Sequence, residues 1–179
     1  MSLALQVVEE SGMSPSLDEA IRESLCECFP ASASTFAKTR AWHGSTPSYS
    51  LVHREGARVV GHVGVIVREI VAGGTPVTVA GIQSFAVIPN RRGTGLSRRL
   101  MEEAMVEAKR HEIPFGLLFC VPGLERFYIS LGWRTLFVRA RMVFEGAETE
   151  IPAKNIAMAL PLAARPFPSG DLHLGGPDW

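Results

Sequence analysis

The chain has 179 residues, 46% of them hydrophobic, and its 18 basic residues balance its 18 acidic ones. A length below about 250 residues favours one domain around one core, so we expect residues 1–179 to form a single domain. Zero net charge argues against a general nucleic-acid or membrane-surface binder. The sequence shows neither a run of about 18 uncharged apolar residues nor a basic-then-apolar leader, which predicts a cytoplasmic protein without membrane contact.

The cysteines and histidines show no metal-binding pattern. Cys26 and Cys28 point to opposite sides of a predicted helix, and Cys120 is isolated in an apolar run, so free thiols are expected. No two of the five histidines, at positions 43, 53, 62, 111 and 173, have the spacing of a metal-ligand pair. We therefore expect no metal ion.

The N-terminal third predicts a strand, a helix and a poorly defined connection. Residues 3–8 resemble a short strand, and an apolar stripe predicts a helix over 17–29, capped by Ser14 or Ser16 and ended by Pro30. Residues 31–47 are rich in Ala, Ser and Thr and are consistent with a second short helix and a loop. From residue 48 the pattern changes to β-branched residues with a period of two.

An antiparallel meander is predicted over residues 49–54, 57–71 and 76–88. Its hairpin signals are Glu55-Gly56 and the stretch 72–75. Between residues 59 and 67 both faces of the predicted strand are apolar, which indicates a sheet covered on two sides.

The second half predicts a β-α-β unit followed by further strands. A helix begins at about Leu96, residues 115–121 form a short strand, and the crossover predicts that 82–88 lies parallel to it. A second helix after Pro122 carries Leu124, Phe127, Tyr128 and Leu131 on one face and ends at Gly132. Strands are expected over 133–145 and 155–162, and the Pro/Gly-rich tail 166–179 is expected to lack regular structure.

These elements predict an α/β (α+β) fold. Its sheet would be mixed and mostly antiparallel, with about six or seven strands, one parallel pair at the glycine-rich turn and helices on both faces.

The glycine-rich turn RRGTGLS (91–97) is the strongest candidate for a ligand site. Gly93 and Gly95 permit positive φ, and the turn leads into a helix N-terminus, which binds anions. Four arginines (91, 92, 98 and 99) crowd that terminus, where the helix dipole disfavours cations. An anionic ligand would reverse this cost. A solvated turn with Arg98/Glu102 and Arg99/Glu103 pairs explains the same pattern equally well.

The spacing of this turn matches neither a P-loop nor the G-x-G-x-x-G dinucleotide fingerprint. RRGTGLS does resemble the R-x-x-G-x-[GA] loop of the GCN5-related N-acetyltransferases, with Arg92 and Gly95 in register and Ser97 in place of the last Gly/Ala. ERFYISLGW (125–133) resembles the acceptor-side helix of that family. The resemblance covers about residues 48–135. Within the superfamily the chain looks most like the aminoglycoside 2′-N-acetyltransferases and the nodulation N-acyltransferases.

The resemblance implies acetyl-CoA as co-substrate and assigns roles to two segments and one side chain. The pyrophosphate would lie on the turn formed by Arg91, Arg92, Gly93, Thr94, Gly95, Leu96 and Ser97. Backbone amides of Phe85, Ala86 and Val87 would hold the pantetheine arm and polarise the carbonyl. Tyr128 would protonate the departing thiolate as general acid. By periodicity alone Tyr128 is a core aromatic, and this alternative remains open.

The general base is not identified by the resemblance. Gln83 stands where such enzymes carry an acid, and an amide cannot accept a proton at neutral pH. His62, His43, Asp178 and the terminal carboxylate of Trp179 are weaker candidates. We also consider that Trp179 folds back toward Tyr128 and helps to bind a cationic acceptor.

The expected function is direct transfer of an acetyl group from acetyl-CoA to a primary amine of a small, cationic acceptor in a ternary complex. Two alternatives remain open, namely a non-catalytic acetyl-CoA sensor and an acyltransferase that uses a longer acyl donor. The lack of an acid at Gln83 favours the sensor. Partners other than the small molecules are not expected, although a homodimer remains open.

Overall fold

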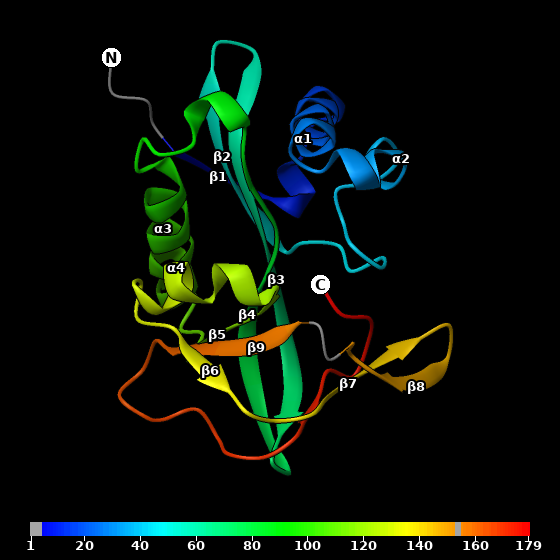
Figure 1. Cartoon of the computed structure of the whole chain (residues 1–179), viewed down its shortest axis with the longest axis vertical. Helices are drawn as coiled ribbons and strands as arrows, with labels where there is room; N and C mark the ends of the chain where they lie inside the picture. Colours follow the sequence, from blue (N-terminus) through cyan, green and yellow to red (C-terminus); the bar gives the residue numbers. More distant parts are fainter. Residues whose placement is uncertain (1–4, 153–154) are drawn as a thin grey trace.

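A single mixed sheet with helices on both faces forms the framework of the computed structural model, which describes residues 5–152 and 155–179 (Figure 1). In this part of the chain the sheet has ten strands, in the order β6-β9-β5-β4-β3-β10-β7-β8, with β1 and β2 branching from β3. The predicted fold class is confirmed, and the sheet has more strands than the six or seven expected. The predicted first strand began at residue 3, and residues 3 and 4 lie outside the described residues.

The meander β2 (Tyr49–Glu55), β3 (Arg58–Ala72) and β4 (Thr75–Val87) is antiparallel, as predicted. β1 (Leu5–Glu9) adds to β2. β3 is long enough to pair with β2 along its first half and with a C-terminal strand at its end. It is therefore the strand that joins the two halves of the sheet.

Helices cover the two faces because neighbouring apolar residues of the strands point in opposite directions. α1 (Pro15–Cys28) packs on the face that carries Val52 and Val59. α3 (Leu96–Arg110) packs on the face that carries Leu51 and Val60. Figure 1 shows the two helices on opposite sides of the upper sheet. The predicted two-sided coverage is thus confirmed.

The sequence signals for the helix ends hold with small shifts. The Ser14 hydroxyl accepts a hydrogen bond from the Leu17 amide at 3.2 Å, which selects Ser14 over Ser16 as the cap of α1. α2 is a single turn, and α4 is shorter than its motif. Leu124 is 45% exposed, contrary to its predicted inward position, because it belongs to the turn before α4. The remaining helical bounds are α2 Ala33–Phe36, α4 Glu125–Ile129, and 3-10 turns η1 Glu10–Gly12, η2 Pro30–Ser32, η3 Pro89–Arg91 and η4 Pro122–Leu124.

The parallel pair is confirmed, but its register differs from the prediction. β5 (Phe115–Cys120) pairs with residues 79–82 of β4, not with 82–88. Beyond Ile82 the β3–β4 register shifts, and Ser84 has a positive φ of 48°. An extra residue bends a strand and increases its twist, so β4 turns away from β5 at this bulge.

The predicted strand 133–145 is wrong, because the chain there serves two edges of the sheet. β6 (Arg134–Leu136) pairs with β9 (Ile156–Pro161), while β7 (Ala140–Phe144) pairs with β8 (Ala147–Glu150) and β10. Residues 137–139 cross between these edges. A pattern of alternating residues cannot report such a crossing.

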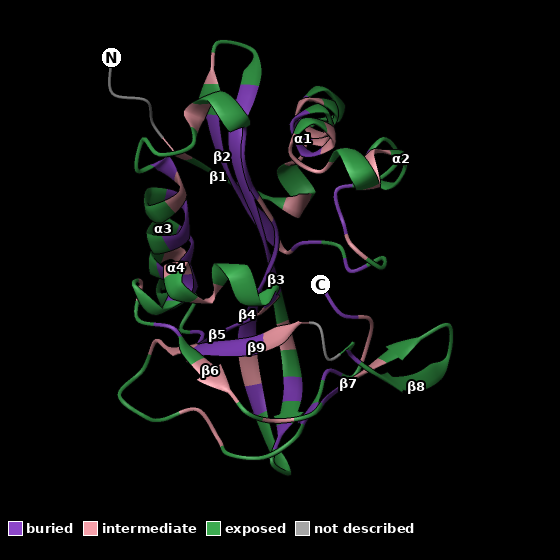
Figure 2. Cartoon of the chain, viewed as in Figure 1, coloured by how far each residue is buried: buried purple, intermediate pink, exposed green. Residues whose placement is uncertain are grey.

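The C-terminal tail is part of the core, contrary to the expectation of an irregular end. β10 (Leu172–His173) lies between β3 and β7, antiparallel to the first and parallel to the second. Leu172 and Leu174 are fully buried, and Figure 2 colours the end of the chain as buried. The tail is buried because apolar residues lie between its glycines and prolines, and packing each of them into the core removes apolar surface from water.

Candidate active site

The opening between β4 and β5 is the centre of the candidate site. In the described residues these strands pair only over 79–82 and 115–118, after which β5 continues alongside β9 and β4 alongside β3. The side of β4 that faces away from β3 therefore has backbone groups at Phe85, Ala86 and Val87 without a neighbouring strand. Such groups are ready to bind an extended ligand.

The glycine-rich turn follows directly at the end of β4. Gly93 and Gly95 have φ of 75° and 84°, as predicted, and a Cβ at either position would meet nothing within 4 Å. The Thr94 hydroxyl donates to the Arg91 carbonyl at 2.7 Å and closes the turn. Gly95 is the N-cap of α3 and supplies no side-chain acceptor to the first amides of the helix. These amides are thus available to an anion.

The arginines around the turn divide into two groups. Arg91 is paired with Glu55, with nitrogen–oxygen distances of 2.6 and 2.5 Å, and Arg98 is 3.3 Å from Glu102. Arg92 donates to the Val87 carbonyl at 3.0 Å. Within residues 5–152 and 155–179, neither Arg92 nor Arg99 has a carboxylate within 4 Å, so the predicted Arg99/Glu103 pair is not formed. Two positive charges therefore remain at the helix N-terminus.

Tyr128 lies at the opening, on α4. Its ring is 6.5 Å from that of Phe85 and 6.0 Å from that of Trp133, and the residue is 4% exposed. Gly132 has the predicted left-handed conformation, with φ of 90°. Burial raises the pKa of Tyr128, and the neighbouring Cys120 contributes a smaller effect of the same sign. The phenol is therefore protonated at neutral pH and can donate a hydrogen bond.

Gln83 is the first residue of β4 beyond its pairs with β5. The side chain is buried, its Oε1 accepts from the Trp42 amide at 3.2 Å, and its Nε2 donates to the Ser45 carbonyl at 2.6 Å. Both ends of the amide are thus bonded to the loop before β2. Gln83 holds this loop on β4 and has no group that could accept a proton.

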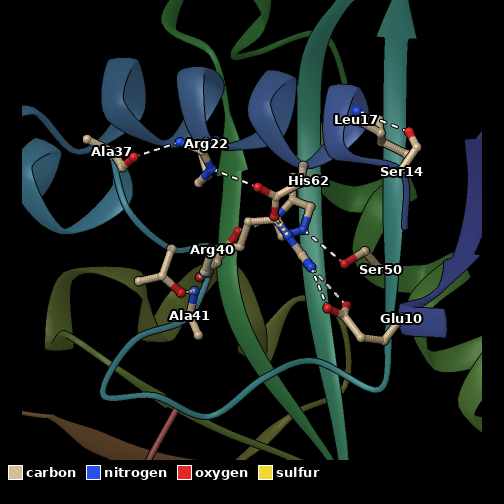
Figure 3. Close-up of polar contacts among 12 residues, drawn as sticks. Glu10, Ser14, Leu17, Arg22, Ala37, Arg40, Ala41, Ser50 and His62 are labelled. Carbon is tan, nitrogen blue, oxygen red and sulfur yellow. Dashed lines mark hydrogen bonds and ion pairs between the residues drawn. The ribbon is translucent and has the colours of Figure 1, made fainter. Parts of the chain in front are cut away.

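His62 lies inside the sheet and is fully buried. Its Nδ1 donates to the Ser84 carbonyl at 2.8 Å, which leaves Nε2 to accept from the Ser50 hydroxyl at 3.2 Å (Figure 3). Burial lowers the pKa of His62 to about 4. Both ring nitrogens are occupied and water is excluded, so the geometry gives His62 a structural role at the bulge and disfavours it as base.

The chain end reaches the β4–β5 pair. Trp179 is 5% exposed, its ring lies 5.9 Å from that of Phe119, and the Arg68 guanidinium carbon is 5.2 Å from its centre. A Cβ at Gly81 would collide with the indole, so glycine is required there. Trp179 and Tyr128 belong to different core clusters. An approach of Trp179 to the acceptor remains a prediction.

Asp178 contacts the Nδ1 of His43, a pairing that sequence reasoning missed. The two residues are separated by 135 positions, and no local pattern connects them. Arg40 and Ser45, which anchor the same loop, were also missed. Their residue types are ordinary for a loop, and only their contacts distinguish them.

A cavity of about 790 Å³ lies on another part of the sheet. Its lining includes Tyr49, Thr78, His111 and Pro114 and none of the predicted site residues. Thr78 and Pro114 precede the β4–β5 pair, so this cavity lies at the amino ends of the parallel strands. Ligands of open α/β sheets bind at the carboxyl ends, where the glycine-rich turn is.

Metal-binding side-chain groups and membrane-spanning helices are the subject of two further observations on the described residues. In the part of the chain that the structure describes, no group of three or more His, Cys, Asp or Glu side chains is arranged to hold a metal ion. In the same part, none of the helices combines the length and the apolar character that a bilayer crossing requires.

Solved structures show which fold the chain has. An Escherichia coli GNAT family N-acetyltransferase (YhbS), solved in complex with CoA, matches with a TM-score of 0.68 at 20% identity, over 98% of this chain and 92% of that one. A GNAT family acetyltransferase from Brucella melitensis, solved with acetyl-CoA, matches with 0.62 at 19%, over 95% of both chains. The fold is therefore that of the GCN5-related N-acetyltransferases, as the turn and helix motifs predicted.

The family is narrower than the fold. Residues 4–170 match the family described as Nodulation protein A (NodA). Nodulation protein A of Bradyrhizobium elkanii is 32% identical over 101 residues, which are 55% of this chain and 47% of that protein. The homologue from Bradyrhizobium sp. (strain NC92) is 28% identical over 112 residues, 62% of this chain and 52% of that protein. The chain belongs to the nodulation protein A family, and it matches about half the length of these relatives.

Proposed function

We propose that this protein is an N-acyltransferase that moves an acyl group from an acyl-CoA thioester to a primary amine of a small acceptor. The observation that carries the proposal is a set of three features on adjacent elements. These features are the exposed turn Arg92–Ser97 with two unneutralised arginines at a helix N-terminus, the unpaired edge of β4, and Tyr128 beside Phe85. A diphosphate, an extended pantetheine arm and a thioester require these three features in this order.

The proposed reaction is direct transfer without a covalent enzyme intermediate. The neutral amine nitrogen attacks the thioester carbonyl, whose oxygen is stabilised by backbone N–H groups of Phe85 to Val87. As the tetrahedral intermediate collapses, the C–N bond remains and the C–S bond breaks. The nitrogen loses a proton to a base, and the departing sulfur receives a hydrogen bond or a proton from the Tyr128 hydroxyl. Amide and CoA thiol are the products.

Acetyl-CoA is the donor that the glycine-rich turn and the solved relatives with CoA and acetyl-CoA support. A longer acyl chain is the second candidate, because apolar side chains beside Tyr128 are exposed. Val121, Leu124 and Ile129, on the turn before α4 and on α4 itself, are 52%, 45% and 53% exposed. Such a surface is available to an acyl tail that extends beyond the thioester.

We propose a cationic acceptor. On the hairpin of β7 and β8 the ring of Phe144 lies 6.2 Å from that of His43, and Glu148 is paired with Arg141 at 2.9 Å. The hairpin also exposes the carboxylates of Glu145 and Glu150. These carboxylates would attract an ammonium group. We further propose that the chain works as a single domain in the cytoplasm, where its three cysteines, all free in the structure, stay reduced. A homodimer is compatible with this proposal.

The test is a thiol-release assay with acetyl-CoA and palmitoyl-CoA as donors and spermidine, glucosamine and tobramycin as acceptors. We expect acceptor-dependent thiol release with at least one pair, and mass spectrometry should show the matching amide. The preferred donor decides between the short and the long acyl chain. If the protein binds CoA in calorimetry but releases no thiol with any acceptor, it is a sensor and the proposal is wrong.

A further inference from the structure

We propose that His43 is the general base for the acceptor amine and that Asp178 is the positioning residue that orients its ring. This inference rests on the proposed acyl transfer. His43 would supply the proton acceptor that Gln83 cannot provide. The observations behind this inference are contacts between the loop before β2 and the C-terminal tail.

The contact between the two side chains has the geometry of a general-base pair. Nδ1 of His43 meets a carboxylate oxygen of Asp178. The Asp178 side chain is only 7% exposed, whereas the His43 side chain is 49% exposed. In the described ranges Nε2 of His43 has no hydrogen-bond partner, so this nitrogen faces solvent. A carboxylate on one nitrogen of an imidazole fixes the tautomer and leaves the other nitrogen ready to accept a proton.

The loop that carries His43 is held on β4 at the opening. Gln83 bonds to the backbone on either side of His43, at Trp42 and Ser45. The Ser84 hydroxyl donates to the Arg40 carbonyl at 2.7 Å. The backbone that carries His43 is therefore held at Gln83 and Ser84, the first β4 residues that have no partner in β5.

Arg40 anchors the start of this loop to the N-terminal elements. Its guanidinium is bonded to Glu10 at 2.7 and 2.9 Å and to Asp18 at 2.5 Å, and Figure 3 shows this ion cluster around Arg40. His43 and Gly44 both have positive φ, of 46° and 84°. A non-glycine residue persists in this conformation only where the surroundings determine it, and such positions gather at functional sites.

Asp178 is fixed in the same place by a second set of contacts. Arg68 donates to the Pro177 carbonyl at 2.6 Å and to the Ser45 hydroxyl at 3.1 Å. The Ser45 hydroxyl in turn donates to the Pro177 carbonyl at 3.1 Å. Trp179 fixes the other side by packing over Gly81 and Phe119. The tail thus closes over the β4–β5 pair with the carboxylate directed at His43.

The charges around His43 fit a base that becomes cationic during turnover. Asp178 approaches it from the tail, Arg68 lies on β3 behind the tail, and the hairpin of β7 contributes the uncharged ring of Phe144 at 6.2 Å. As the C–N bond forms, Nε2 takes the proton from the nitrogen and Asp178 stabilises the resulting imidazolium. The half-exposed ring then returns the proton to solvent.

His43→Asn and Asp178→Asn test the pair, because asparagine tolerates the left-handed backbone at position 43. For His43→Asn we expect kcat for the best donor–acceptor pair to fall by about 10²- to 10⁴-fold, while calorimetry shows unchanged CoA affinity. Asp178→Asn should lower kcat by a smaller factor. His43→Gly should regain turnover when imidazole is added, which a purely structural histidine would not do.

His173→Gln is the matched control. His173 is 45% exposed and lies 4.0 Å from Glu148, so it is also a half-exposed histidine beside a carboxylate, but it is on β10. We expect this variant to keep wild-type turnover. If the wild-type protein releases thiol and His43→Asn stays within about two-fold of it, the base assignment is wrong while acyl transfer stands. The base assignment would also be wrong if His43→Asn lost turnover together with CoA affinity and if added imidazole did not restore turnover to His43→Gly. If the wild-type protein releases no thiol with any acceptor, acyl transfer and the base assignment both fail.

Discussion

Burial gives the polar residues around the opening different tasks. Gln83 uses both ends of its amide for the loop that carries His43, and His62 uses both ring nitrogens inside the sheet. Tyr128 is equally buried, but no hydrogen bond of its hydroxyl is found among the described residues. A hydroxyl without a protein partner is available to a ligand, and that of Tyr128 is not among the fully enclosed unpaired atoms of the described residues. Tyr128 is therefore the buried polar residue that suits proton donation.

Removal of the Tyr128 hydroxyl should affect the chemical step and spare donor binding. We expect Tyr128→Phe to lower kcat by about 10²-fold, because the hydroxyl matters as negative charge develops on sulfur. The ring still packs against Phe85 and Trp133. The acetyl-CoA dissociation constant from calorimetry should not change.

Tyr49→Phe is the matched control, since Tyr49 is the second of the two tyrosines and is also buried. Its hydroxyl donates to the Ala104 carbonyl at 3.2 Å, under α3. We expect this variant to lose about 1 kcal/mol of stability and to keep kcat. Equal kcat in the wild-type protein and in Tyr128→Phe, with chemistry rate-limiting, would make Tyr128 a core aromatic only.

His62 predicts a pH dependence of stability. Its pKa is about 4 in the folded protein and 6.5 in the unfolded chain, so the unfolded chain binds more protons between these values. The stabilisation by neutral His62 is complete above pH 6.5 and is lost as the pH falls toward 4. The integrated loss is about 3 kcal/mol.

The measurement is urea unfolding of the wild-type protein and His62→Gln at pH 7, 5.5 and 4.5. Carboxylates titrate in both proteins, so the informative quantity is the difference between their unfolding free energies. We expect the wild-type protein to lose more stability than the variant on acidification. Parallel losses in the two proteins would contradict a buried neutral histidine.

The N-terminus of α3 is the element on which donor binding depends. Its amides, the two positive φ angles before it and the charges of Arg92 and Arg99 all act at one end of a helix that is buried along one face. The apolar face of α3, including Leu100 and Ala104, fixes this end against the sheet. A rigid scaffold therefore holds an exposed loop, the usual arrangement of a binding site.

A side chain at Gly95 should block the donor. In Gly95→Val the new methyl groups would enter the exposed space before α3, where the diphosphate is expected, and we expect CoA binding to fall below detection in calorimetry. Gly74→Val is the matched control, because Gly74 has nearly the same φ, 82°, and equally open surroundings in the hairpin between β3 and β4. Both variants carry similar backbone strain, and only the first should lose CoA. Unchanged CoA binding in Gly95→Val would place the diphosphate elsewhere.

On the scale of the whole molecule, the loop before β2 and the C-terminal tail meet beside β4. The loop after α2 carries His43, and the tail carries Asp178 and Trp179. β10 ties this tail into the sheet between β3 and β7. The acceptor side of the proposed site is thus assembled from segments that are far apart in sequence, and it exists only when the sheet is complete.

Deletion of residues 175–179 should separate acceptor binding from donor binding. We expect a higher KM for the best amine and, because Asp178 is removed as well, a lower kcat. The dissociation constant for acetyl-CoA should be nearly unchanged, because the glycine-rich turn is untouched. Loss of the buried Trp179 should also lower the unfolding free energy by about 3–5 kcal/mol. Phe137→Ala is the control for this loss of stability. It removes an aromatic ring that is 95% exposed and should change the unfolding free energy by less than about 0.5 kcal/mol. A truncated protein with full activity on its best amine would remove the tail from the mechanism.

Local patterns in the sequence determined the meander, the helix ends and the glycine-rich turn. Alternation of apolar residues predicted β2, β3 and β4, and Ser14 and Gly95 marked helix starts, because propensity and capping act over a few residues. The fold class followed from the order of these elements. The motifs at 91–97 and 125–133 then indicated the superfamily, which the solved structures and the family match confirm.

Only the tertiary structure decided the register of β4 and β5, the crossing between β6 and β7, and the place of the tail. The bulge at Ser84 depends on His62 beneath it, and β10 exists because β3 and β7 offer it two edges. The pair of His43 and Asp178 joins residues 135 positions apart. Such contacts depend on how the whole sheet brings distant segments together, and no periodicity or local motif in the sequence contains that information.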